Sequence, residues 1–100
     1  MPAKPNAEFT NDLYKAILLL ESPEECYNFF CDLCTMSEMK AMEQRFEVAK
    51  LLSEGKIYND ILELTGTSSA TISRVNRCLQ YGAGGYQTIT ERLGFGEESE

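Results

Sequence analysis

Apolar side chains recur every three or four residues along most of the chain, a spacing that places them on one face of a helix. A first stripe predicts a helix built on Phe9, Leu13, Ile17 and Leu20. A longer stripe, ended by Gly55, predicts a third helix whose apolar face consists of Met39, Met42, Phe46, Ala49 and Leu52. No segment has the regular alternation that is typical of a strand, so the pattern predicts an all-α protein.

Capping sequences indicate where two of the helices begin. Ser22-Pro-Glu-Glu25 combines a serine cap, a proline at the first helical position and a glutamate three residues after the cap. The second helix is therefore expected to start there and to run through Phe29, Phe30 and Leu33. Thr35-Met-Ser-Glu38 has the same capping-box spacing and opens the third helix. Glycines divide the remainder into expected helices at 58–65, 69–81 and 86–93.

A chain of 100 residues with 43% hydrophobic content is long enough for one compact domain. We expect a single helical domain over residues 1–93, followed by an acidic, disordered tail over 94–100. The aromatic and aliphatic side chains of the first two helices exceed the needs of one small core. Residues 9–55 are therefore predicted to form dimerisation helices, with a monomeric helical core as the alternative.

Residues 58–81 have the pattern of a helix-turn-helix, with 86–93 as a last short helix. Gly66 supplies the positive φ that the turn requires, and Ile61, Ile72 and Val75 are spaced to close a small core between the two helices. Ser68 or Ser69 can cap the second helix. Its exposed face would then present short polar groups and two guanidinium groups to the major groove of double-stranded DNA. The predicted DNA-binding residues are Ser68, Ser69, Ala70, Thr71, Ser73, Arg74 and Arg77.

The net charge of −7 is unevenly distributed along the chain. Residues 1–34 contribute −4 and residues 82–100 contribute −3, whereas residues 35–81 contain six basic and six acidic residues and are neutral. The segment from Ser68 to Tyr81 contains Arg74 and Arg77 and no acidic residue. A solvated helix face would give the same local charge, so charge alone leaves both interpretations open.

The residue types present favour a protein that is not an enzyme. The chain has no histidine, no nucleophile motif and no glycine loop of the kind that holds phosphates, and no cofactor is expected. Cys31 and Cys34 have the spacing of a metal or redox half-site, but no second such pair completes it. We therefore predict no metal site and interpret all four cysteines as buried, free thiols. The apolar run 16–20 is too short for a signal core or a membrane span, so a cytoplasmic protein is expected.

Residues from about Leu33 to Leu93 resemble the Trp repressor superfamily, in particular its YerC/YecD branch. The resemblance rests on Leu33-Cys-Thr-Met-Ser-Glu38, Ala70-Thr-Ile-Ser-Arg74 and Val75-Asn-Arg-Cys-Leu-Gln-Tyr-Gly-Ala-Gly-Gly-Tyr86. It implies about six helices, a Trp-repressor-like intertwined homodimer whose N-terminal helices interlock with a second copy, and a bacterial transcriptional regulator.

The same resemblance implies an effector pocket at Thr35, Arg45, Arg74 and Val75. In the Trp repressor, tryptophan lies between two arginines, which correspond here to Arg45 and Arg74. Alignment of both arginines with those of the repressor requires a one-residue shortening between Gly55 and Ile61. The alternative role for Arg45 is that of a surface residue paired with Glu38 or a neighbour. Glycine follows the second arginine in the repressor, whereas Val75 follows it here and fills the space of the indole ring. We therefore expect an effector other than tryptophan, or none.

Two functions follow from these observations. The first is a sequence-specific, DNA-binding transcriptional regulator, a repressor, that acts as a homodimer through its helix-turn-helix. The second is a helical protein-interaction module that does not bind DNA by itself, which the acidic total charge and the aromatic N-terminal helices favour.

Overall fold

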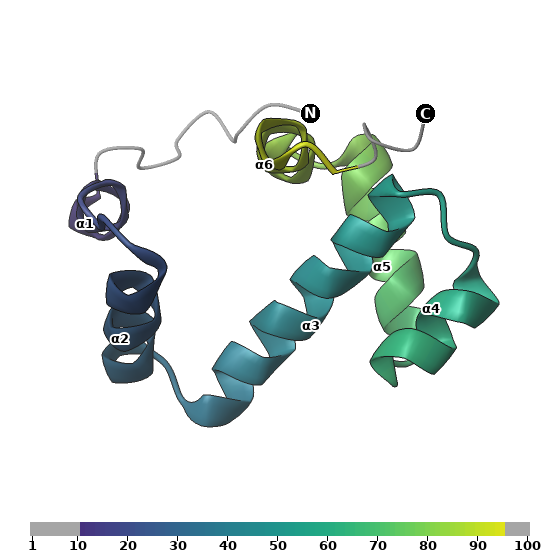
Figure 1. Ribbon diagram of the computed structural model, residues 1–100, viewed down its shortest axis with the longest axis horizontal. Coiled ribbons are helices and arrows are strands. Elements are labelled where there is room, and N and C mark those ends of the chain that lie inside the picture. The colour runs from purple at the N-terminus through teal and green to yellow at the C-terminus, as the bar shows by residue number, and fades with distance from the viewer. Residues whose placement is uncertain (1–10, 96–100) are drawn as a thin grey trace. The chain divides into compact units, whose positions relative to one another are not determined.

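The computed structural model describes residues 11–95, and these form six α-helices and no strand (Figure 1). The all-α class expected from the sequence is therefore confirmed. Phe9 and residues 96–100 lie outside the described part of the chain. Gly94 and Phe95, which the expected tail also included, are described, and their N–H groups donate to carbonyls of α6. The helices, in chain order, are α1 (Asp12–Leu18), α2 (Pro23–Leu33), α3 (Met36–Ser53), α4 (Tyr58–Thr65), α5 (Ser69–Tyr81) and α6 (Gly85–Leu93).

Both predicted capping sequences start helices. The backbone N–H of Glu25 donates to Ser22 Oγ at 3.1 Å, with Pro23 in the first helical position of α2. At α3 the N–H of Glu38 donates to Thr35 Oγ1 at 3.1 Å, and the N–H of Thr35 donates to the Glu38 carboxylate at 2.8 Å. Each pair satisfies N–H groups that have no partner within the helix itself.

The first helix is shorter than its apolar stripe predicts. α1 ends at Leu18, so Leu20 lies in the connection to α2. The N–H of Glu21 donates to the carboxylate of Glu25 at 2.9 Å, which ties Glu21 to the start of α2. Ser22 has an extended backbone, with φ −153° and ψ 159°. The chain therefore leaves helical geometry before Ser22 because the start of α2 requires it.

The described residues form two compact units, which divide inside α3 between Ala41 and Met42. In the first unit neither α1 nor α2 has a buried side chain, and Met39 of α3 is buried. The second unit has a core supplied by α3, α4 and α5. It consists of Val48, Ala49, Leu51, Ile61, Ile72 and Val75, with Leu52, Leu62, Leu79 and Tyr86 packed against it.

The apolar face predicted for α3 was correct only in part. Ala49 is buried, but so are Val48 and Leu51, which the single stripe omitted, while Met42 is 37% exposed. Phe46 is half-buried and faces other neighbours, with its ring 6.5 Å from that of Tyr86 and 6.2 Å from that of Phe95. Because α3 is packed on two sides, its apolar side chains are not confined to one stripe.

The turn between α4 and α5 is held by polar contacts. Gly66 has a φ of 69°, as predicted, and its N–H donates to the carbonyl of Leu62 at 2.9 Å. Gln44 Nε2 on α3 donates to the carbonyl of Thr65 at 3.1 Å, and the N–H of Thr67 donates to Thr65 Oγ1 at 3.2 Å. These bonds satisfy groups at the end of α4 and hold that end against α3.

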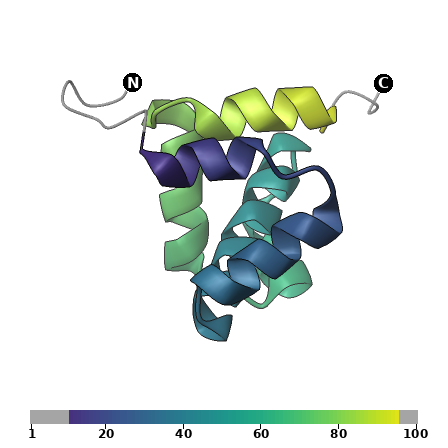
Figure 2. The same cartoon turned by 90° about the vertical axis from the view of Figure 1, so that its left-hand side faces the viewer.

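In the connection after α5, any side chain at Gly82 would force the backbone to move. A Cβ at Gly82 would lie 2.5 Å from the backbone oxygen of Cys78. This close approach ends α5 at Tyr81 and allows α6 to cross the C-terminal end of α5 (Figure 2). Gln87 Nε2 on α6 donates to the carbonyl of Leu79 at 2.8 Å and holds the two helices together.

We predict that Gly66→Ala lowers the free energy of unfolding by about 1–2 kcal/mol, because an L side chain is disfavoured at this positive φ. A Cβ at Gly66 would meet no atom within 4 Å, so the cost is conformational and not steric. Gly85→Ala is the matched control, since Gly85 is helical and equally open. Urea denaturation of both variants measures the difference. Equal stabilities would contradict the role assigned to the turn glycine.

We predict that Ile61→Ala destabilises the protein by about 2–5 kcal/mol, because it leaves a cavity in the core between α3, α4 and α5. Ile57→Ala removes the same atoms four residues earlier, where the side chain is 62% exposed, and should change stability by less than about 0.5 kcal/mol. Thermal and urea denaturation compare the two variants. Similar losses at both positions would show that this core does not determine stability.

Candidate nucleic-acid interface

The α4–turn–α5 segment is built around three fully buried aliphatic side chains. Ile61 of α4 and Ile72 of α5 are 0% exposed, and Val75 is 1% exposed. These are the residues that the sequence predicted to close the core between the two helices. Residues 66–68 form the short connection between the helices, and Figure 1 shows α4 crossing near the start of α5. The buried side chains thus fix the rotation of α5 about its own axis.

That rotation places the predicted contact residues on the outer face of α5. Ser69, Ala70, Ser73, Arg74 and Arg77 are all exposed. Residues 70, 73, 74 and 77 follow helical spacing, and Ile72 and Val75 occupy the opposite, buried face. The helix therefore has one face committed to the core and one face available to a partner.

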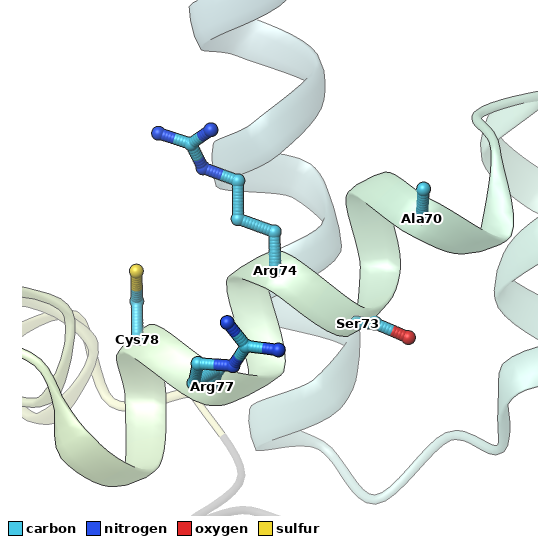
Figure 3. A pocket seen from close by; sticks show the side chains of 5 residues that line it. All are labelled: Ala70, Ser73, Arg74, Arg77 and Cys78. Atoms are coloured by element: carbon cyan, nitrogen blue, oxygen red, sulfur yellow. The ribbon is translucent and has the colours of Figure 1, made fainter.

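The exposed face contains a surface depression of about 550 Å³, lined by Ala70, Ser73, Arg74, Arg77 and Cys78 (Figure 3). Ala70, Arg74 and Cys78 project from the same side of the helix, with Arg74 between the two smaller side chains. Arg77 projects beside them. The depression is therefore lined by three short side chains and two long guanidinium side chains.

The electrostatic character of this face follows from its residue types. No acidic residue occurs between Ser68 and Tyr81. Within residues 11–95, neither Arg74 nor Arg77 makes an ion pair or hydrogen bond with another residue. Two guanidinium groups that the chain itself leaves unpaired can bind phosphate oxygens or the acceptor atoms of a guanine.

Two predicted contact residues have a structural role at the start of α5. Ser68 Oγ accepts the N–H of Thr71 at 3.1 Å and also lies 3.0 Å from Thr71 Oγ1. Thr71 is half-buried, and its hydroxyl oxygen accepts from Ser68 Oγ. Ser68 is thus the N-cap, and the exposed face predicted for α5 is correct except at Thr71.

Cys78 belongs to the candidate interface, although the sequence analysis assigned it to the interior. It is exposed and lines the depression one helical turn after Arg74. The spacing from Arg74 is visible in the sequence, but a free cysteine is usually a small buried hydrophobic residue, so the pattern alone does not place Cys78 at the surface. The expectation of buried thiols is wrong for this chain, since Cys31 is exposed as well and Cys26 and Cys34 are half-buried. All four are free, as predicted.

The residues of the implied effector pocket have separate surroundings. Thr35 caps α3 and belongs to the unit before Met42. Arg45 is half-buried on α3 and does not line the depression that contains Arg74. Val75 lies in the core with Ile61 and Ile72, so its side chain fills interior space. An effector pocket made from these four residues remains a prediction.

The described part of the chain has neither a group of side chains that could hold a metal nor a membrane-spanning helix. Between residues 11 and 95 no three cysteine, aspartate or glutamate side chains are grouped so that they could hold a metal ion. Over the same residues, every helix is too short or too polar to cross a membrane.

Comparisons with known proteins extend the resemblance seen in the sequence. The family model described as Trp repressor protein matches residues 9–94. The uncharacterized protein YerC of Bacillus subtilis (strain 168) is 49% identical over 83 residues, which span 83% of this chain and 80% of that protein. The predicted relationship to the YerC branch is thereby confirmed.

Two crystal structures have the same fold. A TrpR-like protein from Eubacterium eligens ATCC 27750 is 50% identical with a TM-score of 0.84, and the match covers 93% of this chain and 96% of that one. A Staphylococcus aureus protein provisionally identified as a Trp repressor is 47% identical with a TM-score of 0.81, over 85% of each chain. Sequence, fold and family model agree, and the chain belongs to the Trp repressor family.

Proposed function

We propose that this protein is a sequence-specific DNA-binding transcriptional regulator, a repressor, and that α4 and α5 act as its helix-turn-helix. The observation that supports this most directly is the pair of unpaired arginines, Arg74 and Arg77, on the face of α5 opposite its buried side chains. Membership of the Trp repressor family supports the same function. In this proposal the protein has no catalytic role and needs no cofactor. The resemblance implies a bacterial regulator, and bacterial DNA lies in the cytoplasm, so the protein is proposed to act there.

In the proposed complex α5 lies in the major groove and α4 crosses the DNA backbone. The exposed side chains of Ser69, Ala70 and Ser73 are short, so the helix can approach the base edges closely. The acidic charge of the chain lies mainly in residues 1–34 and 82–100, outside α5. Those acidic residues lower non-specific affinity and leave binding dependent on the contacts that α5 makes.

We further propose that the protein acts as a homodimer formed through α1 and α2. Neither helix buries a side chain within the described chain, although both are rich in large apolar residues. A monomer would leave this surface in water, whereas a second copy would cover it. Two copies would place two α5 helices about 34 Å apart, on successive faces of the major groove. The large apolar side chains exposed on α1 and α2 and on the residues that flank them are Leu13, Tyr14, Leu18, Leu19, Tyr27 and Leu33, and Met36 at the start of α3 is exposed as well.

A helical protein-interaction module is the second candidate function. The same exposed apolar surface and the net charge of −7 favour it. It differs from the first proposal in one measurable respect, because such a module would bind DNA weakly at every sequence while retaining its fold and its oligomeric state.

A small-molecule effector is compatible with both candidates. The Trp repressor has glycine where this chain has Val75, and a valine side chain takes space that the indole ring would need. Tryptophan is therefore not the proposed effector. Addition of cellular metabolites to a DNA-binding assay would detect a different effector.

We predict that selection from random duplex DNA at moderate salt enriches a two-fold-symmetric site with the wild-type protein. The Arg74→Ala, Arg77→Ala double variant should enrich none, because it lacks both guanidinium groups of α5. Arg92→Ala removes one positive charge from the exposed surface of α6 and should select the same site as the wild type. Circular dichroism establishes that each variant is folded.

Failure of the folded wild type to enrich any site, with and without cell-extract metabolites, would contradict the proposed DNA binding and favour the interaction module. Enrichment of one site by the wild type and the double variant alike would assign DNA binding to another surface.

We predict that Leu18→Glu raises the dissociation constant of the dimer about 10- to 100-fold, because the side chain is 85% exposed in one chain and covered in the proposed dimer. Asn59→Glu adds the same charge at an exposed position of α4 and should leave the constant unchanged. Analytical ultracentrifugation over a range of concentrations measures both. A monomeric wild type, or a Leu18→Glu variant that associates as tightly as the wild type, would show that α1 is not in the interface.

A further inference from the structure

The two arginines of α5 have different neighbours. Arg74 lies between two small side chains, with Ala70 one turn before it and Cys78 one turn after it on the same side of the helix (Figure 3). Arg77 follows Ser73 by one turn and precedes Tyr81, whose side chain is 72% exposed, by another. The surroundings of Arg74 are therefore open, and those of Arg77 include a large phenol.

Small neighbours suit the geometry of guanine recognition. A guanidinium that donates two parallel N–H groups to O6 and N7 of guanine must lie in the plane of the base pair, with clearance on both sides. The methyl group of Ala70 and the thiol of Cys78 leave that clearance, and neither is a strong acceptor that would hold the guanidinium. Arg74 makes no ion pair or hydrogen bond within residues 11–95 that would have to be broken first.

Position along α5 separates the two arginines further. A recognition helix contacts base edges mainly through its N-terminal part. Arg74 lies in the first half of α5, whereas Tyr81 is its last residue, about 10 Å further along the axis. Arg77 and Tyr81 are one turn apart near the end of the helix. A guanidinium and a phenol O–H are both good donors to phosphate oxygens, which suits contact with the DNA backbone.

From this arrangement we infer that Arg74 recognises a guanine through its major-groove edge, while Arg77 and Tyr81 bind backbone phosphates. The inference rests on the proposed DNA binding and assigns sequence discrimination to one of the two arginines. Ala70 and Cys78 act as the spacers that keep Arg74 free to lie in the base plane. The half-site bound by each protomer accordingly contains one G·C pair that Arg74 alone recognises. Replacement of that pair removes the contact with Arg74 and no other contact.

The test measures the affinity of the full-length protein for its selected site and for every single base-pair substitution of it, over a series of salt concentrations. Arg74→Ala should lose the preference for one G·C pair in each half-site, a loss of about 5- to 100-fold in discrimination. Arg74→Lys retains the charge but not the planar pair of donors. It should keep the salt dependence of the wild type and have a weaker preference for the same G·C pair, because a lysine can still donate to O6 and N7 but lacks the planar fork.

Arg77→Ala should weaken binding to all of these duplexes by a similar factor. The slope of log affinity against log salt should become less steep by about 0.9 for each bound protomer. Arg92→Ala should match the wild type in both measurements, since Arg92 lies on α6.

A modified base identifies the contacted atom without relying on a mutant fold. Replacement of the critical guanine by 7-deazaguanine removes the N7 acceptor, so it should weaken binding by the wild type and leave binding by Arg74→Ala unchanged. Retained preference at every base pair in Arg74→Ala, or loss of one preference in Arg77→Ala, would overturn the inference while the proposed DNA binding stood. Equal affinity of the folded wild type for all duplexes would overturn both.

Discussion

The candidate interface depends on one constraint, the packing of Ile61, Ile72 and Val75 in a common buried cluster. These three side chains have almost no exposed surface, and with Val48, Ala49 and Leu51 they join α3, α4 and α5 in one core. Burial of branched aliphatic side chains is strongly favourable and tolerates little rotation of the helix that supplies them. It follows that the face of α5 with Arg74 and Arg77 points outward because the opposite face is fully occupied.

Polar contacts add precision to this arrangement. The bond from Gln44 to the carbonyl of Thr65 joins α3 to the end of α4, at the point where Gly66 reverses the chain. Ser68 then caps α5 through the N–H of Thr71. Without these bonds the groups at both helix ends would depend on water, whereas here the first bond holds the end of α4 against α3 and the second fixes the start of α5. The placement of the α5 backbone therefore depends on these polar contacts as well as on the core.

The charge distribution and the apolar surface give α5 and the N-terminal helices different properties. The negative charge lies mainly in residues 1–34 and 82–100, so α5 is a locally basic segment in an acidic protein. α1 and α2 present large apolar side chains that the described chain leaves exposed. Large exposed apolar surfaces commonly mark interaction sites, and in the proposed homodimer the second copy covers this one. The proposed dimerisation and the proposed DNA binding thus use separate sets of residues.

Most of the secondary structure was determined by local sequence. The caps at Ser22 and Thr35 and the turn glycine at Gly66 act on neighbouring backbone groups, and the bounds of α4 and α5 agree with those predicted. Periodicity alone also identified the buried residues Ile61, Ile72 and Val75 and most of the exposed face of α5. Each of these features depends on residues that lie close together in the chain.

Only the tertiary structure decided which neighbours each helix meets. α3 is packed on two sides, so Val48 and Leu51 enter the core while Phe46 packs against Tyr86 and Phe95. Cys78 is exposed beside Arg74 because the buried face of α5 is already filled by Ile72 and Val75. The contact of Gln44 with Thr65 joins residues 21 positions apart. Local propensity and periodicity contain no information about such partners, since these depend on how helices distant in sequence pack together.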